Sequence, residues 1–191
     1  MISEKLKTST AENHRIVEES GLMAPILNRT ITKESYARIL KKFYGFFHPL
    51  EITINSFPQL SEYLPDFSER RKSEALIDDL KRLELPQETE YNLCNNLPTL
   101  THLSHAFGCL YVMEGSTLGG KMISRILNDT LNIDETNGAK FFTGYGPTTG
   151  MKWNAFREAL GKYSTETNDD ESVVEAANDT FLKFKQWIDQ D

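Results

Sequence analysis

Cysteine is scarce in this chain, and its scarcity excludes two classes of small protein. Only Cys94 and Cys109 occur among the 191 residues. Two cysteines cannot build a disulfide scaffold, and their spacing is not that of a zinc-binding pair. We therefore expect a protein of a reducing compartment, the cytoplasm.

Long apolar runs and surplus positive charge are missing as well. The opening MISEKLKTST holds no apolar core of a signal peptide, and no later run approaches the length of a membrane span. The 21 basic side chains are outnumbered by 28 acidic ones, which gives a net charge of −7. Nucleic-acid-binding domains usually carry a basic excess. We therefore expect neither a membrane nor a nucleic acid as a partner.

The remaining composition is that of an ordinary globular protein. Hydrophobic residues make up 39% of the chain and charged residues 26%, close to the averages for soluble domains. A length of 191 residues fits one domain better than two. We expect residues 1–191 to form a single domain.

Helical periodicity recurs along nearly the whole chain, and no alternating run of β-branched residues reaches strand length. The first predicted helix starts with Ser3 as its N-cap and ends before Gly21. A longer helix starts after Thr32, and Pro49 is expected to kink it near His48. The predicted helices cover residues 3–20, 22–28, 32–55, 68–83, 86–97, 101–127, 150–163 and 170–189, with irregular segments at 57–67 and 128–150. The predicted fold class is all-α.

Three of these helices allow more detailed predictions. Ser68 is the predicted N-cap of the helix at 68–83, whose opening SERRKSE is predicted to be a solvated face. Pro86 is the predicted start of the next helix. One face of the last helix carries only residues that suit a core: Val173, Ala177, Thr180, Phe181, Phe184, Trp187 and Ile188. This stripe predicts a buried face.

The first helix carries a histidine in a pattern that suits metal ligation. Lys7, His14 and Glu18 are spaced by seven and four residues, with Thr10 between them. They therefore lie on one helical stripe, which the amphipathic pattern turns toward the interior. An imidazole there can bind a metal while its second ring nitrogen donates to Glu18. The alternative is a core or surface histidine paired with Glu18.

The helix predicted at 101–127 is unusually rich in glycine. Eight of the eleven glycines of the chain lie between Gly108 and Gly150, and Gly108, Gly115 and Gly119 share one helical face. Each glycine in a helix interior costs about 0.5–1 kcal/mol relative to alanine. Either close packing of a neighbouring helix or a flat ligand lying against bare backbone would justify that cost, and the pattern leaves both open.

The other candidate residues are interpreted as structural. His102 and His105 are three residues apart and suit a shared metal, but a third ligand is not evident, so capping or core roles are preferred. His48 precedes a proline and is interpreted as structural. Ser116 lies in the glycine-rich helix, where a serine usually bonds to its own backbone but can also orient water. Zinc-protease, hydrolase-elbow and phosphate-loop motifs are absent.

These residues resemble those of a known family, the heme oxygenases. The opening ISEKLKTSTAENHRIVEE is similar to the first helix of that family, in which a threonine precedes the proximal histidine, here Thr10 and His14. The segment LYVMEGSTLGGKMI is similar to the distal helix of bacterial heme oxygenases, especially those associated with bacteriophytochromes. The closing AANDTFLKFKQWI is similar to the last core helix. The resemblance covers essentially the whole chain.

The resemblance implies which residues bind the heme iron on the proximal side and which bind the propionates at the edge of the heme. His14 is the implied axial ligand to the heme iron, and Glu18 is its implied hydrogen-bond partner. Lys7 matches a basic position that pairs with the heme propionates. Arg157 matches another such position, although the preceding loop can shift that part of the alignment.

The resemblance also implies which residues line the distal side of the heme, and at one of these positions the sequence departs from the family pattern. Gly115, Gly119 and the neighbouring Gly120 match the glycines that cover the distal face of heme, where oxygen reacts. Animal members carry an aspartate in this motif that orders the catalytic water, and Ser116 stands in its place. The group that holds the water is therefore Ser116, ordered water on backbone carbonyls, or a residue such as Arg125 or Asn128.

The implied reaction converts heme, O2 and electrons to biliverdin, carbon monoxide and ferrous iron, with heme as both substrate and cofactor. No flavin or nicotinamide motif is visible, so an electron-donor protein of the ferredoxin or flavin-reductase type is expected. A phytochrome is a possible downstream partner. Three alternatives stay open: a non-catalytic heme carrier on the same scaffold, a thiaminase-like enzyme with Cys109 as nucleophile, and a helical interaction module.

Overall fold

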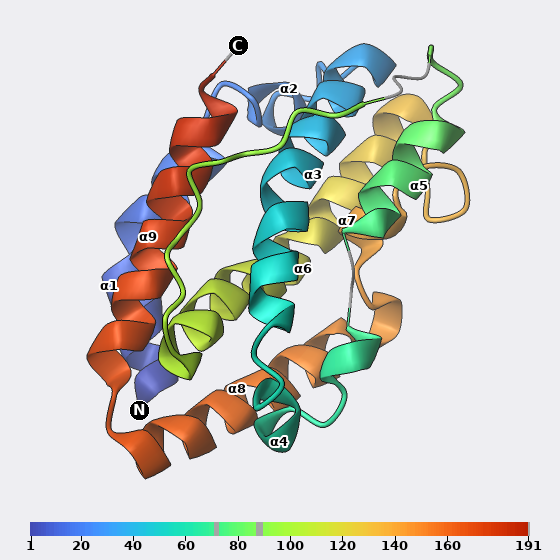
Figure 1. The fold of residues 1–191 in the computed structure, drawn as a ribbon. Coiled ribbons are helices and arrows are strands. Elements are labelled where there is room, and N and C mark those ends of the chain that lie inside the picture. Colours follow the sequence, from blue (N-terminus) through green and yellow to red (C-terminus); the bar gives the residue numbers. More distant parts are fainter. Residues whose placement is uncertain (71–72, 87–89, 191) are drawn as a thin grey trace.

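The computed structural model describes residues 1–70, 73–86 and 90–190, and within these ranges it contains helices and no strand (Figure 1). The helices are α1 (Ile2–Glu18), α2 (Ala24–Leu27), α3 (Lys33–Asn55), α4 (Leu60–Tyr63), α5 (Glu74–Arg82), α6 (Leu103–Leu131), α7 (Lys140–Thr143), α8 (Thr149–Thr167) and α9 (Asp170–Ile188), with 3-10 turns at Phe67–Glu69 and Gly146–Thr148. The all-α prediction is confirmed. No helix in the described ranges is long and apolar enough to span a membrane.

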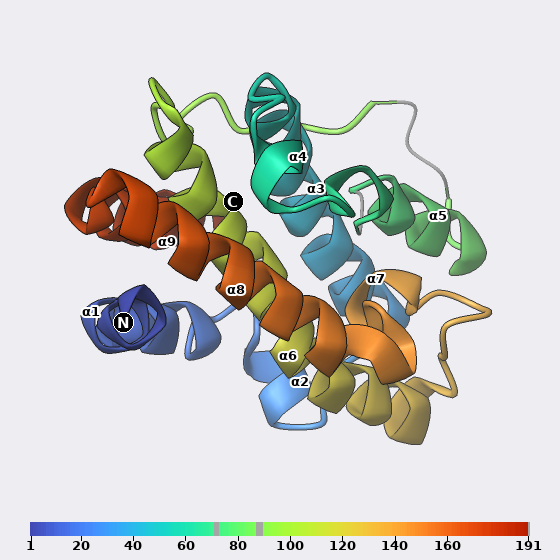
Figure 2. The same ribbon diagram turned by 90° about the horizontal axis from the view of Figure 1, so that it is seen from below.

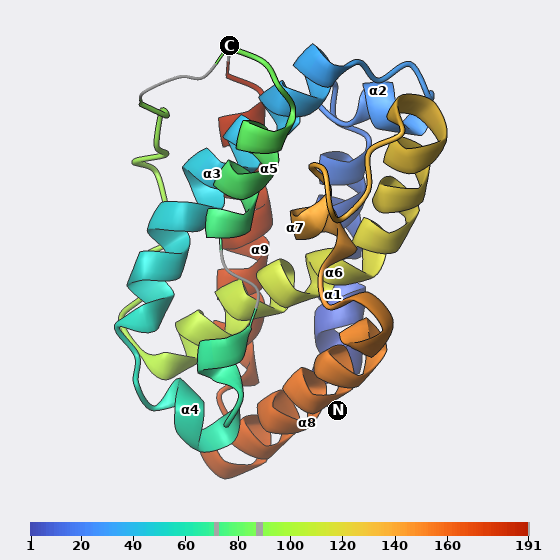
Figure 3. The same cartoon turned by 90° about the vertical axis from the view of Figure 1, so that its right-hand side faces the viewer.

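The longest helix, α6, runs obliquely through the middle of the molecule (Figure 1). It packs mainly against α9, and α1 lies beside α9 on the same side of the molecule. Seen from below, α8 crosses α6 and contacts it as well as α1 (Figure 2). On the other side, α3 packs against α5, and α7 fits between α5 and α6 (Figure 3). The buried apolar side chains of all these helices join in one core.

Helix α3 follows the prediction closely. The Thr32 side chain accepts a hydrogen bond from the backbone N–H of Ser35, whose own hydroxyl accepts from the Thr32 backbone, so the two residues form a capping box. Pro49 lies inside the helix, which continues through it to Asn55. The predicted stripe of α9 is confirmed too, because each of its members is buried.

Both predicted ends of the first helix are wrong. The helix starts at Ile2 with Met1 as its N-cap, so Ser3 lies within the first turn. It ends at Glu18, and Gly21 follows in a turn without a positive φ. The apolar Ile2 is buried, which draws the helix start earlier than the polar cap pattern suggests.

The stretch after α3 differs most from the predictions. The segment 57–67, predicted as a loop, contains the short helix α4. The helix predicted at 68–83 begins only at Glu74, because Ser68 lies in a 3-10 turn and Arg70 turns into the core. The prediction of a solvated face is therefore wrong for Arg70, while residues 71 and 72 lie outside the described residues.

The helix predicted from Pro86 is also wrong where it can be compared. Residues 90–98 are not helical, and residues 87–89 lie outside the described residues. The backbone N–H of Cys94 donates to the carbonyl of Gly45, 2.7 Å away, so this segment lies along α3. A Cβ on Gly45 would come within 2.5 Å of the Asn92 carbonyl and of the Trp187 ring. This close approach to α3 is possible because residue 45 is a glycine.

The glycine-rich helix is longer than predicted. It ends at Leu131 with Asn132 in the left-handed conformation (φ 55°), as is common at helix ends. The predicted irregular segment 128–150 therefore begins with helix, and it also contains α7 and a 3-10 turn.

Candidate functional site

The predicted ligand His14 lies on the outer part of α1. Its side chain is 55% exposed and that of Glu18 is 58% exposed, and Lys7 is exposed as well. The prediction that this stripe faces the interior is therefore wrong for Lys7, His14 and Glu18, whereas Thr10 of the same stripe is buried. Helix α1 packs on its neighbours through Thr10 and through residues beside the stripe, among them the buried Leu6.

The ring of His14 is nevertheless oriented by two neighbours. Its Nδ1 lies 3.3 Å from Oε2 of Glu18, and its edge meets the ring of Phe181 of α9, with the ring centroids 5.7 Å apart. Glu18 thus engages one ring nitrogen, and Nε2 lies on the other side of the imidazole. This arrangement is typical of a metal-binding histidine, whose second nitrogen donates to a carboxylate.

The glycines of α6 divide into two groups by what surrounds them. A Cβ on Gly108 would come within 2.4 Å of the Val173 carbonyl in α9, and one on Gly120 within 2.1 Å of the Phe142 carbonyl. These two glycines allow close packing. A Cβ on Gly115 would meet only the Trp153 ring, at 3.7 Å, and one on Gly119 would meet nothing within 4 Å.

Both interpretations of the glycine pattern therefore apply, each to different residues. Gly108 and Gly120 serve packing, so the structure does not place Gly120 on the open side with its predicted partners. Gly115 and Gly119 have no packing reason to lack a side chain, although each costs about 0.5–1 kcal/mol relative to alanine. A ligand lying against bare backbone remains the reason that suits these two.

The region between helices α1 and α6 begins where Thr10 meets Tyr111. Both helices run upward in Figure 1, and they diverge as they rise. At the lower end, burial raises the pKa of the Tyr111 hydroxyl, and a side-chain hydrogen bond with Thr10 of α1 has a smaller, opposite effect on it. One turn further along each helix stand His14 and Gly115. The predicted ligand His14 and the open glycines are thus at matching heights.

The ends of this region carry charges. Arg157 of α8 is exposed and lies close enough to act on the Tyr111 hydroxyl, whose pKa it lowers against the larger effect of burial. Lys7 lies on α1, one turn before the level of Tyr111. At the far end, Nη1 of Arg29 contacts Oδ2 of Asp129, 3.3 Å away, which joins the segment after α2 to α6.

Ser116, which stands in place of the aspartate of the animal members, bonds to its own helix. The Ser116 hydroxyl donates to the carbonyl of Met113, 2.7 Å away. A hydroxyl that donates once keeps lone pairs with which it can accept. Two further candidates for holding water, Arg125 and Asn128, are exposed residues of the same helix.

The remaining histidines fit structural roles. The rings of His102 and His105 lie 3.8 Å apart, and His102 is 3.8 Å from Asp169. No group of three or more potential metal ligands occurs anywhere in the described ranges. Nδ1 of His48 lies 3.1 Å from the Ser73 hydroxyl and the ring stacks on Tyr44.

Cys109 does not suit the thiaminase-like alternative. Its side chain is buried, and burial raises the pKa of the thiol to about 12, against a smaller effect of the Thr180 hydroxyl, which donates to it. A nucleophilic cysteine needs a lowered pKa and access to its substrate. The second cysteine, Cys94, is also buried, and its thiol pKa is raised by burial.

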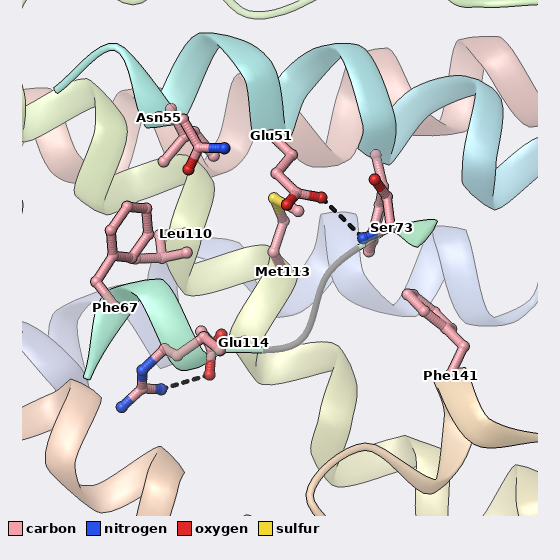
Figure 4. A pocket seen from close by; sticks show the side chains of 11 residues that line it. Glu51, Asn55, Phe67, Ser73, Leu110, Met113, Glu114 and Phe141 are labelled. Atoms are coloured by element: carbon pink, nitrogen blue, oxygen red, sulfur yellow. Dashed lines mark hydrogen bonds and ion pairs between the residues drawn. The ribbon is translucent and has the colours of Figure 1, made fainter. Parts of the chain in front are cut away.

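The sequence patterns missed a buried ion pair directly behind the open glycines. Nη1 of Arg70 donates to Oε2 of Glu114 at 2.6 Å, and the two side chains are only 2% and 5% exposed. Burial opposes the charge of Arg70, but Glu114 and Asp66 outweigh it and raise the pKa of the guanidinium. Figure 4 shows Glu114 at one side of a small cavity. A charge run near a predicted helix start gave no indication of this long-range contact.

The residues between α1 and α6 fit heme. An imidazole with a carboxylate on its Nδ1 suits iron, which histidine commonly binds. Two glycines without a packing role would offer a flat surface to a porphyrin, and the exposed Lys7 and Arg157 would offer positive charge to its propionates.

Comparison with known proteins finds similarity over nearly the whole chain. The family model for heme oxygenase matches residues 1–190. Among solved structures, heme oxygenase from Neisseria meningitidis is 24% identical with a TM-score of 0.80 and covers 98% of this chain and 89% of its own. That from Leptospira interrogans is 19% identical with a TM-score of 0.79, covering 98% of both chains.

A third structure, heme oxygenase-1 from the cyanobacterium Synechocystis in complex with heme, is 18% identical with a TM-score of 0.79, and the match covers 98% of this chain and 90% of that one. At these identities the three structures establish the shared fold. No curated protein matches the sequence. The match of the family model over nearly the whole length decides the assignment: the chain belongs to the heme oxygenase family, whose enzymes degrade heme.

Proposed function

We propose that heme binds between α1 and α6, with its iron on Nε2 of His14, and is degraded there to biliverdin, carbon monoxide and ferrous iron. The observation that carries this proposal is the pairing of an oriented imidazole with two unpacked glycines at the same height. Heme supplies the iron that activates oxygen and is itself the molecule oxidised.

The protein contributes orientation on the proximal side. The carboxylate of Glu18 lies 3.3 Å from Nδ1 of His14, so it holds the proton on that nitrogen and keeps Nε2 as the ligating atom. The edge contact with Phe181 limits rotation of the ring. His14 would hold the heme iron from the side of α1, with Gly115 and Gly119 on the side of α6.

On the distal side the protein contributes a close backbone and a proton path. Gly115 and Gly119 allow the main chain of α6 to approach the porphyrin without a side chain between them. Ser116 donates to the Met113 carbonyl and can accept from a water molecule on the heme side. Such a water is suited to deliver a proton to the reacting oxygen.

Lys7 and Arg157 set the orientation of the heme in its plane. Their positive charges would pair with the two propionates and so determine which meso carbon is presented to α6. Because the chain shows no flavin or nicotinamide motif, electrons come from a donor protein of the ferredoxin or flavin-reductase type.

We further propose that the chain is of the bacteriophytochrome-associated type and that its pigment passes to a phytochrome. The support is the similarity of LYVMEGSTLGGKMI to the distal helix of those enzymes. Addition of an apo-phytochrome to the completed reaction tests this step, since uptake of the pigment gives a phytochrome spectrum. Pigment that stays free would contradict it.

The test of heme ligation compares two histidine variants. We expect His14→Ala to lose the Soret band of the ferric complex and its turnover with reductant and oxygen. His102→Ala is the matched control, because its side chain is similarly exposed at 45% but lies at the start of α6.

Retention of the wild-type spectrum by His14→Ala would contradict the assignment of the ligand. The pigment made by the wild type tests the reaction itself. If the wild type binds hemin but forms no bilin with an electron donor, the chain is a heme carrier instead.

A further inference from the structure

The buried ion pair of Arg70 and Glu114 makes further hydrogen bonds on both of its side chains. Both oxygens of the Glu114 carboxylate are engaged, Oε2 by Nη1 of Arg70 at 2.6 Å and Oε1 by the hydroxyl of Tyr145 at 2.8 Å. An ion pair this buried loses much of its hydration, so it is weak evidence of stabilisation and stronger evidence of a defined geometry.

The guanidinium of Arg70 also reaches beyond α6. Its Nη2 donates to the backbone carbonyl of Lys152 at 3.0 Å, and its Nε donates to Oδ1 of Asp66 at 3.1 Å. The ammonium of Lys152 in turn donates to Oδ2 of Asp66 at 2.6 Å. One side chain therefore joins the middle of α6 to the first turn of α8.

These two attachment points adjoin the open side of the site. Glu114 directly precedes Gly115, and successive residues point about 100° apart around a helix, so the carboxylate points away from the open glycine face. Lys152 directly precedes Trp153, whose ring is the nearest atom group to the missing Cβ of Gly115, at 3.7 Å. Arg70 thus ties the side chain of Glu114 on one side of this contact to the main chain of Lys152 on the other.

Packing holds this part of α6 on its buried side, where Gly120 lies against the Phe142 carbonyl, but not at the exposed Gly119. Gly115 and Gly119 lack side chains that would lock the helix in place. On the opposite side lies a cavity of about 20 Å³, lined by Met113, Glu51 and Asn55 among others (Figure 4). A cavity of that size has room for one water molecule and leaves its walls without tight contacts.

We propose that Arg70, Glu114 and Tyr145 are positioning residues that fix the Gly115–Gly119 segment of α6 relative to Trp153, and thereby set the space above the bound heme. The proposal rests on the function proposed above for this face of α6. The three side chains do not touch the heme, and they act through the main chain of α6 and α8.

The test uses two mild variants and a control on the same helix. Glu114→Gln keeps the shape of the side chain but removes its charge, and Tyr145→Phe removes one hydrogen bond. The control is Ser104→Ala, because the buried hydroxyl of Ser104 also bonds twice, with Tyr163 at 2.6 Å and Asp169 at 2.5 Å, but near the start of α6.

The first readout is hydrogen exchange of the heme-free protein. We expect the amides of residues 112–121 to exchange about tenfold faster in Glu114→Gln and Tyr145→Phe, the effect of losing one buried hydrogen bond. Ser104→Ala is expected to leave this segment unchanged. If all three variants alter residues 112–121 alike, or none does, the proposal is overturned.

The second readout is the pH of the spectral transition from water to hydroxide in the ferric hemin complex. We expect it to shift in Glu114→Gln and Tyr145→Phe and to stay at the wild-type value in Ser104→Ala. Equal values in all four proteins would overturn the proposal even if the variants lose stability. A wild type that binds no hemin would contradict the proposed function, whereas the exchange experiment would still decide whether these residues position α6.

Discussion

Adjacent glycines of α6 are predicted to respond oppositely to the same substitution. Nothing lies within 4 Å of a Cβ on Gly119, so Gly119→Ala is expected to stabilise the heme-free protein by about 0.5–1 kcal/mol, the helix preference of alanine over glycine. At Gly120 the Cβ would come within 2.1 Å of the Phe142 carbonyl, a backbone atom. Gly120→Ala is therefore expected to destabilise by about 1–3 kcal/mol, as overpacking does.

Urea denaturation of the heme-free variants measures both effects, and hemin titration separates packing from ligand binding. Gly119→Leu places a larger side chain in the same open position, so it is expected to keep the fold but to weaken hemin binding by a factor of about 100 or more, because the wall that accommodates the porphyrin is filled. If Gly119→Ala loses as much stability as Gly120→Ala, the distinction between open glycines and packing glycines is refuted. Hemin affinity of Gly119→Leu equal to the wild type would refute the role of Gly119 as a heme wall.

Two other predictions concern single polar groups. Ser116→Ala is expected to shift the water-to-hydroxide transition of the ferric hemin complex while changing the unfolding free energy by about 1 kcal/mol or less, because it removes one hydrogen bond to a backbone carbonyl; an unchanged transition would remove this serine from the distal water network. Asp79 is buried and accepts from the backbone N–H groups of Lys140 and Phe141, and burial, which those hydrogen bonds only partly offset, raises its pKa from 3.8 to about 6. Its contribution to stability is therefore present at low pH and lost as pH rises through about 6, so the unfolding free energy of the wild type relative to Asp79→Asn should fall by up to about 3 kcal/mol between pH 4 and pH 8. A difference that stays constant over that range would contradict the raised pKa.

The sequence by itself determined the features that depend on neighbours along the chain. The caps and periodicity of α3 predicted its ends, because a capping box and a helical stripe are encoded within a few residues. The spacing of His14 and Glu18 likewise predicted their contact, since residues four apart meet on any helix. The resemblance of the first helix and of the glycine-rich helix to those of heme oxygenases predicted the family.

Only the tertiary structure decided which residues meet across the fold. Gly108, Gly115 and Gly119 share one helical face, yet only Gly108 packs closely against another helix, because α9 lies there. Gly120, directly after Gly119, packs closely because the Phe142 backbone lies beside it. Arg70 looked like part of a charged surface, but a partner 44 positions away along the chain draws it into the core. Helical spacing specifies the direction in which a side chain points, whereas burial depends on distant segments that no local pattern describes.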